Sequence, residues 1–175
     1  MWIRKLVAVG ALASHAGRRK LRASSQSRRG HNRMPRALLL AAGRFLIALI
    51  FVRAGINKLG ALAATSASMR SHGIPYPDIL VWGAVILEIG GGLMLIAGLF
   101  TRWAALALFL YTLALALIFH AYWSAPAATA RTDASFFFGH LSMMGGMLYV
   151  VAFGAGALSI DALLNRGRVE MRERK

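Results

Sequence analysis

Four apolar stretches of roughly twenty residues dominate this chain of 175 residues, and Glu88 is the one acidic residue inside them. A helix needs about 20 residues to cross the ~30 Å hydrocarbon core of a bilayer. The predicted spans are residues 36–59, 79–100, 103–123 and 135–158. Because the connections between them are short, successive helices should pack as antiparallel neighbours. The sequence therefore predicts an all-α integral membrane protein, a four-transmembrane-helix antiparallel bundle.

The chain divides into three segments by composition. Residues 1–35 form a basic tail that we expect to be disordered or to lie on the membrane surface. Residues 36–161 form the membrane domain, and residues 162–175 form a charged tail. Met34 stands directly before the first span, so the sequence leaves open whether translation starts at Met1 or at Met34.

The net charge of +15 is concentrated outside the spans. About half of the 21 basic residues precede residue 37, where there is no acidic residue, and more follow the last span. By the positive-inside rule both termini should be cytoplasmic, and the 60–78 and 124–134 connections should face outward. Attraction of the basic tails to anionic lipid explains this charge, so we expect a lipid bilayer and no nucleic acid as partner. The chain contains no cysteine, which excludes thiol–disulfide chemistry and cysteine-ligated iron–sulfur clusters.

Beyond Arg36 at its first position, the first span carries three cations within its apolar sequence. Arg44 and Lys58 fall on one helical face with Phe51 and Gly55, whereas Arg53 falls nearly opposite. A charge in hydrocarbon costs about 2.5–3.5 kcal/mol on insertion scales, so Arg44 and Lys58 should face the bundle. Arg53 should either extend toward the interface or contact another helix.

Glu88 lies near the middle of the second span and is followed by Gly91 and Gly92, which permit close approach of another helix. The antiparallel arrangement predicts that Glu88 faces Arg44 or Arg53 inside the bundle. Three interpretations remain open for this acid: a structural salt bridge, a proton acceptor or ligand partner, and a protonated, unpaired side chain.

His120 and His140 lie near the outer ends of the third and fourth spans, the half of the bundle that also holds Lys58. Each histidine alone is typical of a hydrogen-bonded packing residue. Met143, Met144 and Met147 follow His140 at helical spacing, which would suit copper or haem but equally suits an apolar core. We predict no metal site.

These residues together resemble the DoxX family of bacterial inner-membrane proteins over about residues 36–161. The motifs that carry the resemblance are RFLIALIFVRAGINKL (44–59), the P-x-P entry at 75–77, LEIGGGLMLIAGLFTRWAAL (87–106), the Phe-His pair at 119–120, and GHLSMMGGMLYVVAFGAGALSID (139–161). In one departure, Gly139-His140 stands where family members usually have Lys-Asn, so a role of that lysine does not transfer.

The resemblance implies an inner-membrane, multi-pass protein, and some relatives are linked to quinone-dependent oxidation of sulfur compounds or to membrane oxidoreductase complexes. We therefore expect a redox accessory subunit that binds quinone or a membrane or periplasmic redox partner, without catalysis being established. The alternatives are a non-catalytic scaffold or assembly subunit and, ranked last, a proton or small-solute pathway. Glu88 is the candidate proton relay, and the candidate ligand-binding residues are Arg44, Arg53, Lys58, Glu88, His120 and His140.

Overall fold

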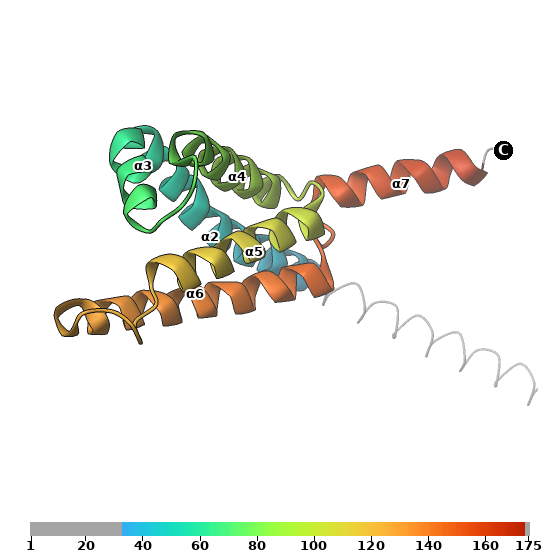
Figure 1. Cartoon of the computed structure of the whole chain (residues 1–175). Helices are drawn as coiled ribbons and strands as arrows, with labels where there is room; N and C mark the ends of the chain where they lie inside the picture. The colour runs from blue at the N-terminus through green and yellow to red at the C-terminus, as the bar shows by residue number, and fades with distance from the viewer. Residues whose placement is uncertain (1–32, 174–175) are drawn as a thin grey trace, which may run out of the picture. The chain divides into compact units, whose positions relative to one another are not determined.

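The computed structural model describes residues 33–173 as a succession of helices (Figure 1). They are α2 (Arg33–Leu59), α3 (Leu62–Ser71), α4 (Pro77–Ala97), α5 (Thr101–Phe119), α6 (Ala127–Phe153) and α7 (Ile160–Glu173). The chain divides into two units at Leu39, and the bundle described below consists of the residues from Leu40 onward. The prediction about the basic tail concerns residues that, up to residue 32, lie outside the described part.

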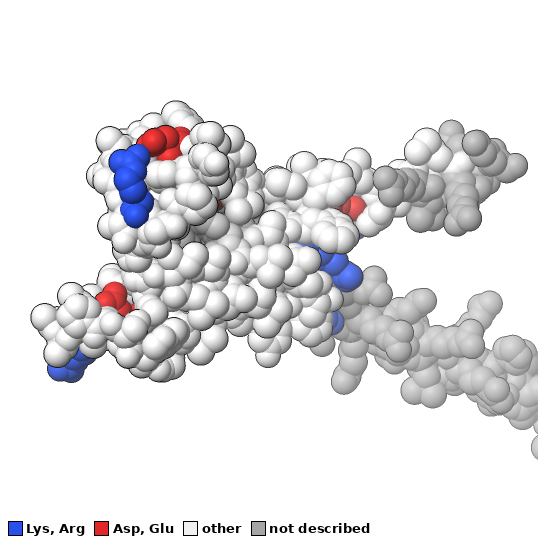
Figure 2. Space-filling view, in the orientation of Figure 1, with Lys and Arg blue, Asp and Glu red and all other residues white. Residues whose placement is uncertain are grey.

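Within the described residues, four helices are long and apolar enough to cross a membrane: Arg36–Leu59, Pro77–Ala97, Thr101–Phe119 and Ala127–Phe153. This confirms the predicted helical membrane bundle. The visible face of the bundle is almost without charged side chains, which gather toward its two ends (Figure 2). A band of this kind is what contact with lipid requires, because a charge exposed to hydrocarbon is costly.

The boundaries of the spans differ from the prediction at several helix ends: α5 ends at Phe119 rather than at residue 123, and α6 ends at Phe153 rather than at residue 158. The 60–78 connection, expected to be a turning segment, contains the helix α3, and α6 begins at Ala127 inside the predicted 124–134 loop. Alanine-rich sequence supports helix in both segments, and in the first of them the prolines at 75 and 77 confine the break to the residues after Ser71.

Helix α3 is fixed against the beginning of α4. Met69 packs in a small apolar cluster with Val81 and Ala84. The hydroxyl of Ser66 donates to the carboxylate of Asp78, and Arg70 forms an ion pair with the same residue at 3.1 Å. This attachment places the polar face of α3 over one end of the bundle. We call this end of the bundle the α3 end.

The core of the bundle joins α2, α4, α5 and α6. Its buried apolar side chains are Ala48, Phe51, Leu95, Ala104, Ala105, Leu108, Met144, Met147 and Val150. Helices α2 and α4 approach closely through glycine: a Cβ atom at Gly92 would lie 3.2 Å from the carbonyl oxygen of Ala48, and one at Gly55 would lie 3.2 Å from the Cβ of Glu88. The predicted role of Gly92 in helix contact is thus confirmed.

At the other end of the bundle, which we call the α7 end, Asp161 of α7 caps the first turn of α5. Its carboxylate accepts hydrogen bonds from the backbone N–H of Phe100 at 2.9 Å, the backbone N–H of Thr101 at 3.0 Å and the Thr101 hydroxyl at 2.9 Å. Desolvation alone would raise the pKa of Asp161, but the hydrogen bonds from Thr101 and Phe100 and the charge of Arg44 hold it below its ordinary value. This contact ties the chain after α6 back to the turn between α4 and α5.

Candidate functional site

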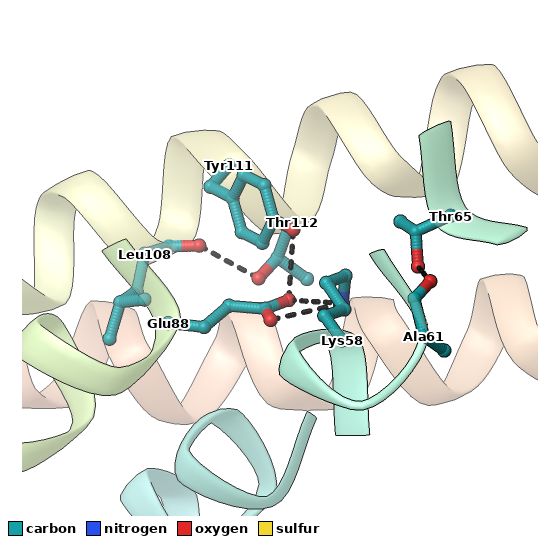
Figure 3. Close-up of polar contacts among 7 residues, drawn as sticks. All are labelled: Lys58, Ala61, Thr65, Glu88, Leu108, Tyr111 and Thr112. Carbon is teal, nitrogen blue, oxygen red and sulfur yellow. Dashed lines mark hydrogen bonds and ion pairs between the residues drawn. The ribbon is translucent and has the colours of Figure 1, made fainter. Parts of the chain in front are cut away.

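The centre of the candidate site is a group of three polar side chains on three helices, which we call the Lys58–Glu88–Tyr111 triad. The Lys58 Nζ donates to both carboxylate oxygens of Glu88, at 2.8 and 3.0 Å, and the Tyr111 hydroxyl donates to Glu88 Oε1 at 2.8 Å. Glu88 is 1% exposed. Figure 3 shows the carboxylate extended from α4 toward the other two side chains. Three charge-assisted hydrogen bonds satisfy a carboxylate that apolar residues surround.

This pairing overturns one prediction, because Glu88 faces neither Arg44 nor Arg53. Gly55 packs against Glu88 and so marks the same level of the bundle. Helical rise then places Lys58 about 4.5 Å and Arg44 about 16 Å along the axis from that level. Arg53 is nearer in depth but lies on an exposed face of α2. The prediction placed the two helices side by side by matching the ends of their apolar stretches. In the structure, their relative depth is instead set where glycines allow the two backbones to approach closely.

Arg44 faces the bundle, as predicted, and is 2% exposed. Its guanidinium donates to the backbone carbonyls of Leu95 at 3.1 Å and of Leu158 at 2.6 Å, so it joins the end of α4 to the segment after α6. These contacts give Arg44 a structural role at the α7 end. The structure therefore brings neither Arg44 nor Arg53 to the triad.

A cavity of about 460 Å³ adjoins the triad at the α3 end. Its walls come from α2, α3, α4, α5 and α6 and from His120, which follows α5. The apolar part of the lining consists of Ile50, Phe51, Ala54, Met69, Leu115, Phe119 and Met143. The polar part consists of Lys58, Thr65, Ser68, His72, Glu88, Tyr111, Thr112, His120 and His140. Four of the six candidate ligand-binding residues thus line one space: Lys58, Glu88, His120 and His140.

The histidines of the cavity lie on different elements and are held by local contacts. The rings of His120 and His140 stack with their centroids 5.1 Å apart, and the ring of His72 lies 4.5 Å from that of Phe119. His120 also contacts the carboxylate of Asp133 through Nδ1 at 3.4 Å. His120 and His140 thus line one cavity with Lys58, as expected of residues in the same half of the bundle, whereas Arg53 lies outside the lining.

The arrangement combines an apolar, ring-sized space with hydrogen-bonding groups at more than one side. The Lys58 ammonium uses two of its three N–H groups on Glu88, which leaves one N–H for a ligand. The Thr112 hydroxyl donates to the Leu108 carbonyl of its own helix at 2.7 Å. Pockets for small organic ligands likewise combine apolar and aromatic walls with polar groups that fix the orientation of the ligand. Among the residues that the structure describes, no group of three or more His, Cys, Asp or Glu side chains could hold a metal ion.

Several members of the site were not predicted from the sequence. Tyr111 was missed, although a phenol in the middle of an apolar span is an available signal. His72, the C-cap residue of α3, was missed because this helix was not predicted. Asp133 was assigned to an outer loop, yet it lies on α6, where it contacts His120.

Comparison with known proteins supports the resemblance found in the sequence. The model of the DoxX family matches residues 39–121. The chain is similar to the inner membrane protein YphA of Escherichia coli (strain K12), with 32% identity over 126 residues, 72% of this chain and 90% of the relative. It is also similar to the inner membrane protein YqjF of the same organism, with 33% identity over 123 residues, 70% of this chain and 89% of the relative. No solved structure matches the chain.

Proposed function

The chain belongs to the DoxX family, and we propose that it is a bacterial inner-membrane redox accessory subunit that binds a quinone-type ligand in the cavity beside the Lys58–Glu88–Tyr111 triad. The names of both relatives place them in the inner membrane. The four apolar helices of this chain suit the same location. The redox partner would be a membrane or periplasmic protein that exchanges electrons with the bound ligand.

The observation that carries this proposal is the composition of the cavity. A quinone has a flat apolar ring with oxygens at opposite edges, and it reaches its site through the membrane. The aromatic and aliphatic walls suit the ring, and Lys58 supplies an N–H donor for an oxygen. Glu88, hydrogen-bonded to Lys58 and Tyr111, is placed to accept a proton from a ligand at this position.

The test is binding of quinone to purified protein in mild detergent. A solvent extract of the purified wild type should contain quinone, and the protein should bind an added one-ring benzoquinone or its reduced form. Lys58→Met should remove this binding, because it deletes the donor and uncovers the Glu88 carboxylate. Arg53→Leu is the matched control: it removes a cation from the same helix, on an exposed face outside the cavity lining, and should bind as wild type does.

A second function, a non-catalytic scaffold, is favoured by one specific observation. Lys58 and Tyr111 both satisfy Glu88, so the triad is complete without a ligand and could serve folding specificity alone. The same experiment separates the two functions. A wild-type protein that binds neither the oxidised nor the reduced form of the quinone, together with a stability loss in Lys58→Met, would leave only the scaffold.

A pathway for protons or small solutes ranks last. Such a pathway needs a continuous polar line toward the α7 end, where the candidates were Arg44, Thr112 and Ser142. Arg44 and Thr112 donate to backbone carbonyls, and Ser142 is exposed and donates to Phe138 of its own helix. These residues support no such line.

For the orientation in the membrane we propose that both termini are cytoplasmic. The proposal rests on the basic residues that precede the first span and follow the last one, against single basic residues in the two opposite connections. It places the α3 end, with the cavity, on the periplasmic side. A periplasmic redox partner would then approach over α3 and the start of α6.

A further inference from the structure

The three histidines that line the cavity share one feature of hydrogen bonding. In each, Nδ1 contacts an oxygen outside the ring: the Ser68 carbonyl at 2.8 Å for His72, the Asp133 carboxylate at 3.4 Å for His120, and the Phe136 carbonyl at 2.8 Å for His140. His72 also has the Ser71 hydroxyl at 3.3 Å from the same nitrogen. These contacts come from three different parts of the chain.

The shared feature fixes which ring nitrogen carries the hydrogen. A carbonyl or carboxylate oxygen only accepts hydrogen bonds, so the nitrogen that contacts it must donate. In the neutral imidazole the other nitrogen, Nε2, is then an acceptor. Within the described part of the chain, no hydrogen bond engages the Nε2 atom of His72, His120 or His140. In their neutral form these histidines thus give the cavity lining hydrogen-bond acceptors that no described residue engages.

The hydrogen-bond acceptors of the cavity and the Lys58 donor lie on different helices or segments of its lining. One donor is Lys58, on α2, whereas His120 and His140 stack together where the chain after α5 meets α6. Asp133 holds the His120 ring from α6 and does not itself line the cavity, which makes it a positioning residue. A ligand that satisfies this lining must offer hydrogen-bond donors to the histidines as well as an acceptor to Lys58.

We infer that the cavity binds its ligand in the reduced, hydroxyl-bearing form, a hydroquinone, and discriminates against the oxidised quinone. The inference rests on the proposed function and specifies the chemical form of its ligand. Hydroquinone hydroxyls donate to Nε2 of His120 and His140, and a hydroxyl oxygen still accepts from Lys58. Quinone oxygens only accept, so they leave the histidine acceptors without partners.

The experiment compares the two redox forms of one probe. Wild-type protein in detergent is titrated under argon with 2,3-dimethoxy-5-methyl-1,4-benzoquinone and, separately, with its hydroquinone. We expect at least about tenfold tighter binding of the hydroquinone, because one well-placed hydrogen bond corresponds to about a tenfold change in affinity. This comparison uses wild-type protein and does not depend on the folding of a variant.

Variants of His140 link the preference to the acceptors. His140→Leu should reduce the preference severalfold, and His140→Gln should restore part of it, because the glutamine side-chain oxygen is again an acceptor. Ser142→Ala is the matched control, since Ser142 is exposed on the same helix and donates only to the Phe138 carbonyl. Its preference should equal that of wild type. Solid-state ¹⁵N spectra should show the cavity histidines protonated at Nδ1 and unprotonated at Nε2.

The outcomes separate this inference from the proposed function. Binding of the quinone equal to or tighter than binding of the hydroquinone would overturn the inference and leave the proposed function standing. Equal preference in wild type and His140→Leu would also overturn the assignment of the acceptors. If neither form binds, the proposed function fails and the inference fails with it.

Discussion

Replacing Lys58 by methionine should destabilise the bundle far more than removing Lys58 and Glu88 together. Lys58 donates to both oxygens of Glu88, and the Glu88 side chain is 2% exposed. In Lys58→Met, the buried carboxylate keeps one donor, the Tyr111 hydroxyl. An acid left uncompensated in an apolar interior is a much larger defect than an absent ion pair.

The magnitude follows from two limits. At an effective dielectric constant of about 20, charges ~3 Å apart attract by about 5 kcal/mol before desolvation is counted. Breaking a buried ion pair by removing one partner typically costs about 3–5 kcal/mol, because it leaves an uncompensated charge. Lys58→Met should therefore lose about 3–4 kcal/mol of unfolding free energy. The double variant Lys58→Met/Glu88→Met leaves only Tyr111 without its acceptor and should lose about 1 kcal/mol.

The assay is reversible unfolding in mixed detergent micelles, followed by tryptophan fluorescence, for wild type, both single variants and the double variant. The double-mutant cycle then gives the interaction energy of the pair. Arg53→Leu is the control and should be within about 0.5 kcal/mol of wild type, because Arg53 is exposed. Equal losses in Lys58→Met and in the double variant would refute the reasoning, since the unpaired carboxylate would then carry no penalty.

Four further predictions concern the frame around the site. Arg44→Lys should lower the unfolding free energy by about 2 kcal/mol in the same assay, because one lysine ammonium cannot reach both the Leu95 and the Leu158 carbonyls as the planar guanidinium does. Wild-type stability of this variant would contradict the prediction. Gly55→Ala should cost about 1–3 kcal/mol through overpacking, whereas Gly43→Ala, where a Cβ meets nothing within 4 Å, should cost nothing measurable. Because the pKa of Asp161 is lowered in the fold, its stabilisation is present above the ordinary aspartate pKa of about 4 and is lost as the pH falls through the lowered pKa. Asp161→Asn should remove that acid-dependent step from a stability–pH profile, and an unchanged profile would argue against the cap. An alkaline phosphatase fused after the last residue should be inactive, and activity there would place the C-terminus in the periplasm.

The sequence predicted the class of fold because apolar length is a strong constraint in a membrane protein. Each span must supply its own backbone hydrogen bonds over the full thickness of the hydrocarbon. The ends of the helices were predicted less well, because polar and alanine-rich residues can extend a helix beyond the membrane. Helix α3 and the start of α6 at Ala127 are the two cases.

Part of the site was predictable from depth alone. Lys58, His120 and His140 lie near the ends of apolar stretches that an antiparallel bundle brings to the same side, and all three line the cavity. His72 was not predictable in this way, because its position depends on the packing of α3 against α4. Tyr111 was predictable from its phenol hydroxyl, which is a polar group inside an apolar span.

The partner of Glu88 was predicted incorrectly because helical periodicity gives the direction of a side chain and not its depth relative to a neighbouring helix. Two contacts determine that depth: Gly55 against Glu88, and Gly92 against the backbone at Ala48. Both involve glycines, since a larger residue at either position would force the helices apart. Matching glycines of one predicted helix to bulky or polar residues of the next would have brought Glu88 within about one helical turn of Lys58. The partner of a buried acid is therefore best predicted after the close contacts of the two helices have been identified. Those contacts decide which cation lies near enough to pair with it.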